Sequence, residues 1–200
     1  MSKNKVAMAI DIDGVLADFE MEFCQSFGYE NREMDNLEQR YPKFADIITE
    51  FVQNPDTYSD LLPIFGGVLL VRQAIARGFR VALLTARPKT AFAVTRKWLK
   101  EYEVPYDDLI FCPDKYAGIE YYNGIHENDP SCSIRVLVDD LIQNVKELPE
   151  GVKGLLWEQP WNSNSTLIQK LPLVRYNNEK MRLETKLDTV SDWIDLWRLK

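Results

Sequence analysis

The sequence predicts an α/β protein in which a parallel sheet is covered on both faces by helices. Short runs that are almost continuously apolar alternate along the chain with longer stretches whose apolar residues recur at helical spacing. Three of the apolar runs are also followed directly by Asp or Thr side chains. Because strands that are buried on both faces are apolar throughout, this pattern favours a parallel sheet with a helical layer on each side.

Five strands and three helices are expected from these patterns. The strands are the runs KVAMAI (5–10), FRVALL (79–84), LIFC (109–112), IRVLV (134–138) and GLLW (154–157). The helices cover residues 67–78, 89–102 and 189–199. Gly78 is expected to end the first of these helices, because glycine readily adopts the left-handed conformation that often closes a helix.

Residues 19–63 have a different character. This part of the chain is polar and helix-forming, and Pro42 and Pro55 interrupt it. We expect a small helical cap here, inserted after the first strand and able to cover a site. The core domain would then consist of residues 1–18 and 64–200.

Composition excludes several classes of function. The chain has 200 residues and a net charge of -7, which argues against binding to nucleic acid or to anionic membranes. No apolar run approaches the roughly 20 residues of a membrane span. The three cysteines form no C-x-x-C pair, which indicates reduced thiols and a cytoplasmic location. Any mechanism that needs histidine would depend on His126 alone, in a polar loop pattern.

Acidic and hydroxyl side chains follow three of the predicted strands. Asp11 follows the run 5–10, Thr85 follows 79–84, and Asp139 and Asp140 follow 134–138. In an open parallel sheet, ligands bind beyond the carboxyl ends of the strands. We therefore expect these side chains to meet in one crevice, although they are far apart in the sequence.

These residue types suit phosphoryl transfer assisted by a metal ion. Asp11 offers a nucleophile, and Asp13, two residues later, offers a general acid and base. Mg²⁺ prefers oxygen ligands, which Asp11, the backbone carbonyl of Asp13 and a carboxylate at 139–140 can supply. Gly14 allows a tight turn after this pair.

Two further residues are candidates for holding a phosphate. Thr85 offers a hydroxyl and a backbone N–H to a phosphate oxygen. A lysine is needed to balance the carboxylates, and Lys115 in FCPDKY is the first choice, with Lys89 as the alternative.

Taken together, the motifs resemble those of the haloacid dehalogenase superfamily, which has a Rossmann-like fold. DIDGV is similar to its D-x-D-G-[TV] motif, LLTAR to its Ser or Thr motif, Lys115 to its lysine motif and VLVDD to its acidic motif. Within the superfamily the chain resembles the 5'(3')-deoxyribonucleotidases. Residues 11–19 read DIDGVLADF, residues 55–67 read PDTYSDLLPIFGG, and residues 158–162 read EQPWN, each similar to a stretch typical of that family.

The resemblance implies a role for each matching residue. Asp11 would form an aspartyl-phosphate, and Asp13 would protonate the leaving sugar oxygen and then activate water. Asp140 would bind Mg²⁺ directly, with Asp139 close by. The expected phosphate and substrate contacts come from Thr85, Ala86, Lys115, Phe19 and Tyr58, the last two facing the nucleoside. Asp18 is expected to cap the first helix, and Trp98, Trp193 and Trp197 to lie in the core.

The sequence also departs from the family pattern. The family often has Thr-Ser where this chain has Thr85-Ala86, so a phosphate or sugar contact is lost or replaced by Arg87. The arginine that often precedes the family's lysine is absent, since residues 112–115 read CPDK. Residues 116–133 are longer than the usual link and are interpreted as an extra flap or an oligomer contact.

The leading hypothesis is a Mg²⁺-dependent phosphatase acting on deoxyribonucleoside 5'- or 3'-monophosphates. One alternative is a phosphatase for another small phosphoester or for a nucleic-acid 3'-phosphate end. The other is a non-catalytic protein that binds nucleotides. We expect a small-molecule substrate, no nucleic-acid or membrane partner, and a homodimer formed through the cap or through residues 116–133.

Overall fold

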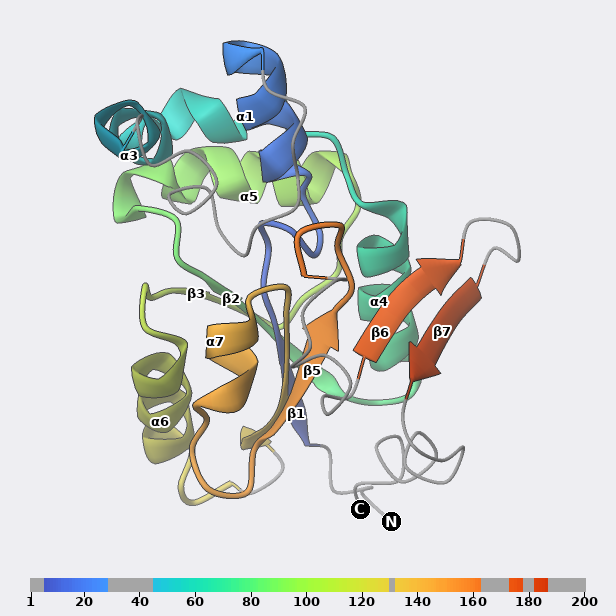
Figure 1. Ribbon diagram of the computed structural model, residues 1–200. Coiled ribbons are helices and arrows are strands. Elements are labelled where there is room, and N and C mark those ends of the chain that lie inside the picture. Colours follow the sequence, from blue (N-terminus) through green and yellow to red (C-terminus); the bar gives the residue numbers. More distant parts are fainter. Residues whose placement is uncertain (1–5, 29–44, 130–131, 163–172, 178–181, 187–200) are drawn as a thin grey trace.

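The computed structural model describes residues 6–28, 45–129, 132–162, 173–177 and 182–186. Its centre is one sheet with the strand order β3-β2-β1-β4-β5-β6-β7 (Figure 1). The five strands that the sequence predicts form most of the parallel part: β1 (Ala7–Ile10), β2 (Arg80–Thr85), β3 (Asp108–Phe111), β4 (Ile134–Asp139) and β5 (Lys153–Trp157). The predicted class, a parallel sheet flanked by helices, is confirmed.

Two strands were not predicted. β6 (Leu173–Asn177) pairs in parallel with β5, and β7 (Arg182–Lys186) pairs with β6 in the antiparallel direction at the edge. Each is five residues long and carries several polar residues, so neither has the continuous apolar run of the central strands.

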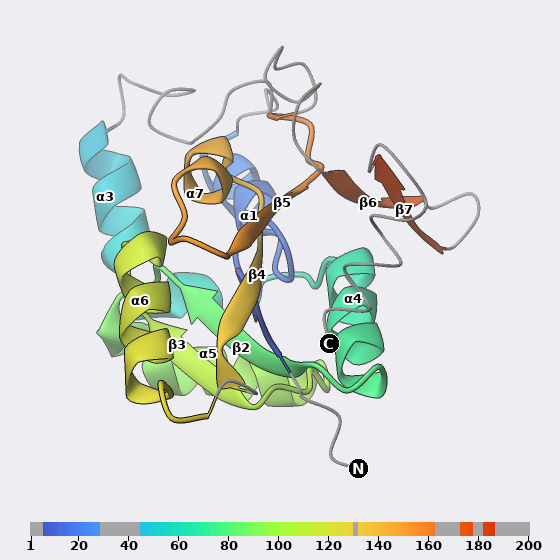
Figure 2. The same ribbon diagram turned by 90° about the horizontal axis from the view of Figure 1, so that it is seen from below.

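Helices cover both faces of the sheet, as Figure 2 shows from below. On one face α4 (Phe65–Ala76) and α5 (Phe92–Glu101) pack on apolar side chains of β1, β2 and β4. On the other face α6 (Lys115–Ile125) and α7 (Ile142–Lys146) pack on the opposite set. Alternate residues of β1, such as Met8 and Ala9, belong to the two different core clusters, because successive side chains of a strand point to opposite faces.

Most of the predicted helices lie near their expected positions. α4 ends at Ala76, and Gly78 follows in the left-handed region with φ of 87°. The helix predicted over 89–102 forms a short 3-10 turn, η3 (Lys89–Ala91), and then α5. The helix predicted over 189–199, with Trp193 and Trp197, lies outside the described residues.

The interpretation of residues 116–133 as a flap is wrong for most of the segment. Its first part forms α6, whose Ile119 and Tyr122 are buried against the sheet. A connection between two parallel strands has to cross back along the sheet and usually does so through a helix. α6 makes this connection between β3 and β4.

The described part of the predicted cap consists of α1 (Phe19–Phe27), α3 (Ala45–Gln53) and the 3-10 turn η2 (Pro55–Tyr58). α1 and α3 lie beyond the carboxyl end of β1, at the top of Figure 1. The chain leaves and re-enters the core side by side: the Asp18 amide donates to Leu62 O at 2.8 Å, and the Ile64 amide donates to Leu16 O at 2.7 Å. Asp18 also caps α1 as expected, because its Oδ1 accepts from the Met21 amide at 2.9 Å.

Candidate active site

The ends of β1 and β4 bring three carboxylates together. Asp11 follows β1, Asp139 ends β4, and Asp140 is the next residue. One ligand oxygen from each lies within 4.8 Å of the others, and all three side chains are buried. β1 and β4 are neighbours at the point where the strand order reverses direction along the sheet, which is the usual ligand position in such folds.

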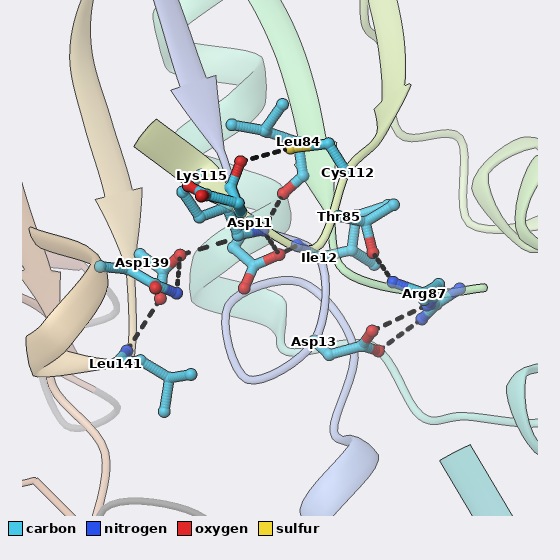
Figure 3. Close-up of polar contacts among 12 residues, drawn as sticks. Asp11, Ile12, Asp13, Leu84, Thr85, Arg87, Cys112, Lys115, Asp139 and Leu141 are labelled. Atoms are coloured by element: carbon cyan, nitrogen blue, oxygen red, sulfur yellow. Dashed lines mark hydrogen bonds and ion pairs between the residues drawn. The ribbon is translucent and has the colours of Figure 1, made fainter. Parts of the chain in front are cut away.

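A lysine from α6 completes this acidic cluster (Figure 3). Lys115 is the first residue of α6, and its Nζ donates to Asp11 Oδ1 at 2.7 Å and also to Leu84 O. The same Nζ lies 4.0 Å from Asp139 Oδ2. Asp114 sets the start of the helix, since its Oδ1 accepts from the Ala117 amide at 3.0 Å. Lys89, the alternative lysine, is exposed on η3.

The protonation of the cluster reflects its burial. Burial, reinforced by the charge of Asp11, raises the pKa of Asp139 to about 7. Burial and the charge of Asp139 raise the pKa of Asp140 well above its usual range, and burial also raises the pKa of Asp11 despite the nearby Lys115. Burial opposes charge on Lys115 as well, but Asp11 and Asp139 outweigh it and raise the pKa of the ammonium.

These residues fit a hard divalent cation. Among the residues that the structure describes, one ammonium group faces three buried carboxylates, so the ionised carboxylates would carry more negative charge than Lys115 balances. The donors are oxygen atoms, which Mg²⁺ prefers over nitrogen and sulfur. Asp11, Asp139 and Asp140 are therefore the residues that would hold such an ion.

A second segment holds the acidic cluster in place. The Trp161 Nε1–H donates to Asp140 Oδ2 at 3.0 Å, and Asn162 Nδ2 donates to Asp140 O at 2.9 Å. Gln159 Nε2 donates to Gly14 O at 2.6 Å, which ties this segment to the turn after Asp11. The sequence indicated that Trp161, in the stretch EQPWN near the acidic motif, could contact a substrate, but not that it would bind Asp140.

Gly14 makes the close approach of these parts geometrically permissible. Its φ is 80°, in the left-handed region that favours glycine. A Cβ at this position would collide with the side-chain carboxylate of Asp140. The turn after β1 and the end of β4 can therefore lie this close only where residue 14 has no side chain.

Asp13 lies apart from the three carboxylates and pairs with Arg87. The guanidinium donates from Nε to Asp13 Oδ2 at 2.8 Å and from Nη2 to Oδ1 at 2.6 Å, as Figure 3 shows. The side chain of Arg87 is 0% exposed, whereas that of Asp13 is 24% exposed. The sequence indicated that Arg87 could replace a missing substrate contact but not that it would pair with Asp13.

The residues that were expected to contact the phosphate and the nucleoside lie beside the pair formed by Asp13 and Arg87. Thr85 ends β2 and is buried, and its Oγ1 accepts from the Arg87 amide at 3.2 Å, while Ala86 is exposed between them. Phe19 is half-buried and stacks on Tyr58 with ring centroids 5.6 Å apart. The hydroxyl of the buried Tyr58 donates to Val52 O at 2.7 Å.

The remaining aromatic residues with predicted positions are mostly structural. Trp98 lies in the core, as expected, and its Nε1–H donates to Leu61 O at 2.7 Å. Trp157 is also buried in the core. His126 is the C-cap residue of α6, with its ring centroid 4.5 Å from that of Tyr122. Among the helices that the structure describes, none combines the length and apolarity needed to cross a membrane.

The fold is that of haloacid dehalogenase-like hydrolases. A haloacid dehalogenase-like hydrolase from Streptococcus pneumoniae shares the fold at 13% identity, over 88% of this chain and 96% of that one, with a TM-score of 0.60. A hydrolase from Deinococcus radiodurans, solved with bound phosphate and sodium, also shares the fold. It is 13% identical, the match covers 84% of this chain and 89% of that one, and the TM-score is 0.54. The chain spans 42% and 47% of two chains of an RNA repair complex, each at a TM-score of 0.48.

A match to a family model shows to which family the chain belongs. Residues 4–170 match the family model described as 5' nucleotidase, deoxy (pyrimidine), cytosolic type C protein, and the chain belongs to this family. A protein of Chlorobaculum tepidum described as "Putative 5'(3')-deoxyribonucleotidase" is 31% identical over 143 residues, which are 61% of this chain and 70% of that protein. The family places the chain among the phosphoric monoester hydrolases.

Proposed function

We propose that the protein is a Mg²⁺-dependent phosphatase that hydrolyses deoxyribonucleoside monophosphates through an aspartyl-phosphate. The observation that carries this proposal is the position of Asp11, buried at the end of β1 between Lys115 and the pair Asp139 and Asp140. A nucleophile in this position can meet a phosphoryl group whose negative charge the lysine offsets. Family membership supports the nucleotide as substrate.

The residues would divide the reaction into two steps. An oxygen of Asp11 attacks phosphorus, the bond from phosphorus to the sugar oxygen breaks, and Asp13 gives its proton to that oxygen. Water then attacks the phosphorus of the aspartyl-phosphate, Asp13 takes a proton from this water, and Asp11 is released as a carboxylate. A bound Mg²⁺ would supply electrostatic stabilisation of the charge on the transferring phosphoryl group.

The binding residues would act on different parts of the substrate. Lys115 and Thr85 would hold the phosphoryl oxygens, together with the exposed backbone at Ala86. The stacked rings of Phe19 and Tyr58 support a nucleoside contact on the side of the predicted cap, with Phe19 the more accessible of the two. We also propose a cytoplasmic location, which the three widely spaced cysteines without a C-x-x-C pair support, and a homodimer as the assembly.

Phosphate release from a panel of substrates tests the proposal. The panel contains deoxy- and ribonucleoside 5'- and 3'-monophosphates, sugar phosphates and a 3'-phosphorylated oligonucleotide, each with Mg²⁺ and with EDTA. We expect turnover of deoxynucleotides that EDTA and Asp11→Asn abolish, and no effect of Glu101→Gln, which changes an exposed carboxylate on α5.

Other results would redirect the assignment. Turnover of sugar phosphates or of the oligonucleotide alone would retain the mechanism and replace the substrate. Nucleotide binding without any phosphate release would contradict the proposed phosphatase activity and favour a non-catalytic protein that binds nucleotides.

A further inference from the structure

Arg87 is a charged side chain that is fully buried beside the site. Its side chain is 0% exposed, although it follows directly after Thr85 and the exposed Ala86. A buried guanidinium is stable only where its charge is paired and its N–H groups are hydrogen-bonded. Its surroundings therefore indicate what the residue does.

Three parts of the chain fix the guanidinium. Two parallel N–H groups bind both oxygens of Asp13, at 2.8 and 2.6 Å, which is the fork geometry that orients a carboxylate most strictly. Nη1 donates to Thr95 Oγ1 on α5 at 3.1 Å. The ring of Tyr58, from η2, lies against the guanidinium with 4.4 Å between Cζ and the ring centroid. Arg87 thus has a single orientation, and so has the Asp13 carboxylate that it holds.

This arrangement separates Arg87 from the phosphate-binding role. A residue that holds the phosphoryl group needs N–H groups directed toward the substrate, but the fork of Arg87 is occupied by Asp13. Asp13 itself is 24% exposed, so it remains open to a substrate on its other side. Each carboxylate oxygen has two lone pairs, so one remains on each oxygen for a transferred proton while Arg87 is bound.

We propose that Arg87 is the positioning residue of the acid–base step. It holds the Asp13 carboxyl in the orientation from which the proton passes to the leaving sugar oxygen and, later, from water back to Asp13. The proposal rests on the phosphatase function proposed above. It assigns Arg87 no contact with the phosphoryl group, which Lys115 and Thr85 hold.

The test compares two substrates that differ in their need for a proton. From a deoxynucleotide, the deoxynucleoside leaves as a strongly basic alkoxide unless it is protonated, whereas p-nitrophenyl phosphate releases a weakly basic phenolate that departs without a proton donor. For Arg87→Met we expect the rate of leaving-group release in a single turnover, which reports the first step alone, to fall by about 10²-fold or more for the deoxynucleotide, since positioned proton transfer contributes about 10²–10⁴-fold. For p-nitrophenyl phosphate this first-step rate should fall much less, whereas the later hydrolysis of the aspartyl-phosphate is common to both substrates and should slow equally. The substrate concentration that half-saturates the first-step rate should change little for both substrates.

Two further variants sharpen the comparison. Arg87→Lys keeps the charge but loses the fork, so it should recover only part of the deoxynucleotide activity. In an Asp13→Asn background, Arg87→Met should cause no further loss, because the carboxylate that it orients is already gone. Arg96→Met is the matched control, since Arg96 lies exposed on α5 with its Cζ 5.6 Å from the ring of Phe92, and both activities should be unchanged.

The outcomes separate this proposal from the proposed function. A wild-type protein that releases phosphate from neither substrate would overturn both. An active wild type whose Arg87→Met variant loses first-step rate equally on both substrates, or whose Asp13→Asn form binds substrate more weakly once Arg87→Met is added, would overturn the role of Arg87 alone. If circular dichroism shows that Arg87→Met does not fold, Thr95→Val replaces it, because this variant removes the hydrogen-bond acceptor of Arg87 Nη1. Its first-step rate should fall more for the deoxynucleotide than for p-nitrophenyl phosphate. An equal fall for both substrates would again contradict the proposal.

Discussion

At the scale of single residues, the site depends on a glycine that cannot be exchanged. Gly14 has a φ of 80° and no room for a Cβ beside Asp140, whereas Gly28 has a φ of 70° with open space around it. Gly28→Ala should lower the free energy of unfolding by about 1–2 kcal/mol, from the backbone alone. Gly14→Ala should cost clearly more, because the carboxylate of Asp140 has to move as well. Urea unfolding of both variants measures the difference, and equal costs would show that the close approach has no energetic weight.

Trp161→Phe addresses a single hydrogen bond in the acidic cluster. The variant keeps an aromatic ring but loses the N–H that donates to Asp140 Oδ2. We expect Mg²⁺ affinity to fall about 10-fold, because groups that orient a metal ligand typically contribute about 10–100-fold. Isothermal titration calorimetry with Mg²⁺ measures this directly. Trp157→Phe is the control: it removes a core indole without changing the Asp140 side-chain contact, so its Mg²⁺ affinity should stay at the wild-type value.

The single residues that sequence reasoning identified best are those at strand ends. Asp11, Asp139 and Asp140 come together as expected because an apolar strand fixes where its next residue lies. Arg87 and Gln159 were not assigned their partners, since each pairs with a residue more than seventy positions away. Such contacts depend on how two loops cross, and no local pattern encodes that crossing.

At the scale of elements, the five strands that form apolar runs could be predicted from the sequence, whereas β6 and β7, which have no such run, could not. The five predicted strands appear in the sequence as apolar runs because helices cover both faces of the sheet. β6 and β7 have polar residues among the apolar ones, and β7 lies at the edge of the sheet. α6 was missed for a different reason: Gly118 and Gly124 interrupt its helical pattern.

Gly118 is itself a packing requirement of α6. A Cβ at this position would collide with Cys112 Sγ and lie 3.3 Å from Leu84 Cδ1. Gly118→Ala should therefore push the start of α6 away from β2 and displace Lys115 from Asp11. We expect both a lower melting temperature and a lower kcat. Gly124→Ala, on the same helix with open space at its Cβ, should be neutral or slightly stabilising, and differential scanning fluorimetry with the phosphate-release assay compares the two.

At the scale of the whole molecule, the acidic cluster makes stability depend on pH and on metal. The native pKa of Asp139 is raised to about 7, so the folded protein binds more protons than the unfolded chain between the ordinary carboxyl range and pH 7. The free energy of unfolding of the metal-free protein should therefore fall as the pH rises through this window. Raised pKa values of Asp11 and Asp140 act in the same direction.

Mg²⁺ should reverse this trend, because only the deprotonated carboxylates bind it well. The increase in melting temperature on adding Mg²⁺ should be larger at pH 8 than at pH 5.5. Differential scanning fluorimetry with and without EDTA measures the increase at each pH. Asp139→Asn should weaken the dependence on both pH and Mg²⁺, and an equal Mg²⁺ effect at the two pH values would contradict the assignment of the cluster as a cation site.

The way in which residues 19–63 join the core has a consequence for how such proteins diversify. The two connections run side by side, with Ala17 bridged to Pro63 and backbone hydrogen bonds from Asp18 to Leu62 and from Ile64 to Leu16. A segment whose ends are already adjacent adds little loop-closure cost when it is lengthened, shortened or exchanged. The sheet and its acidic cluster can therefore stay constant while residues 19–63 are replaced as a cassette, which gives evolution and protein engineers a way to change one part of the molecule without disturbing the other.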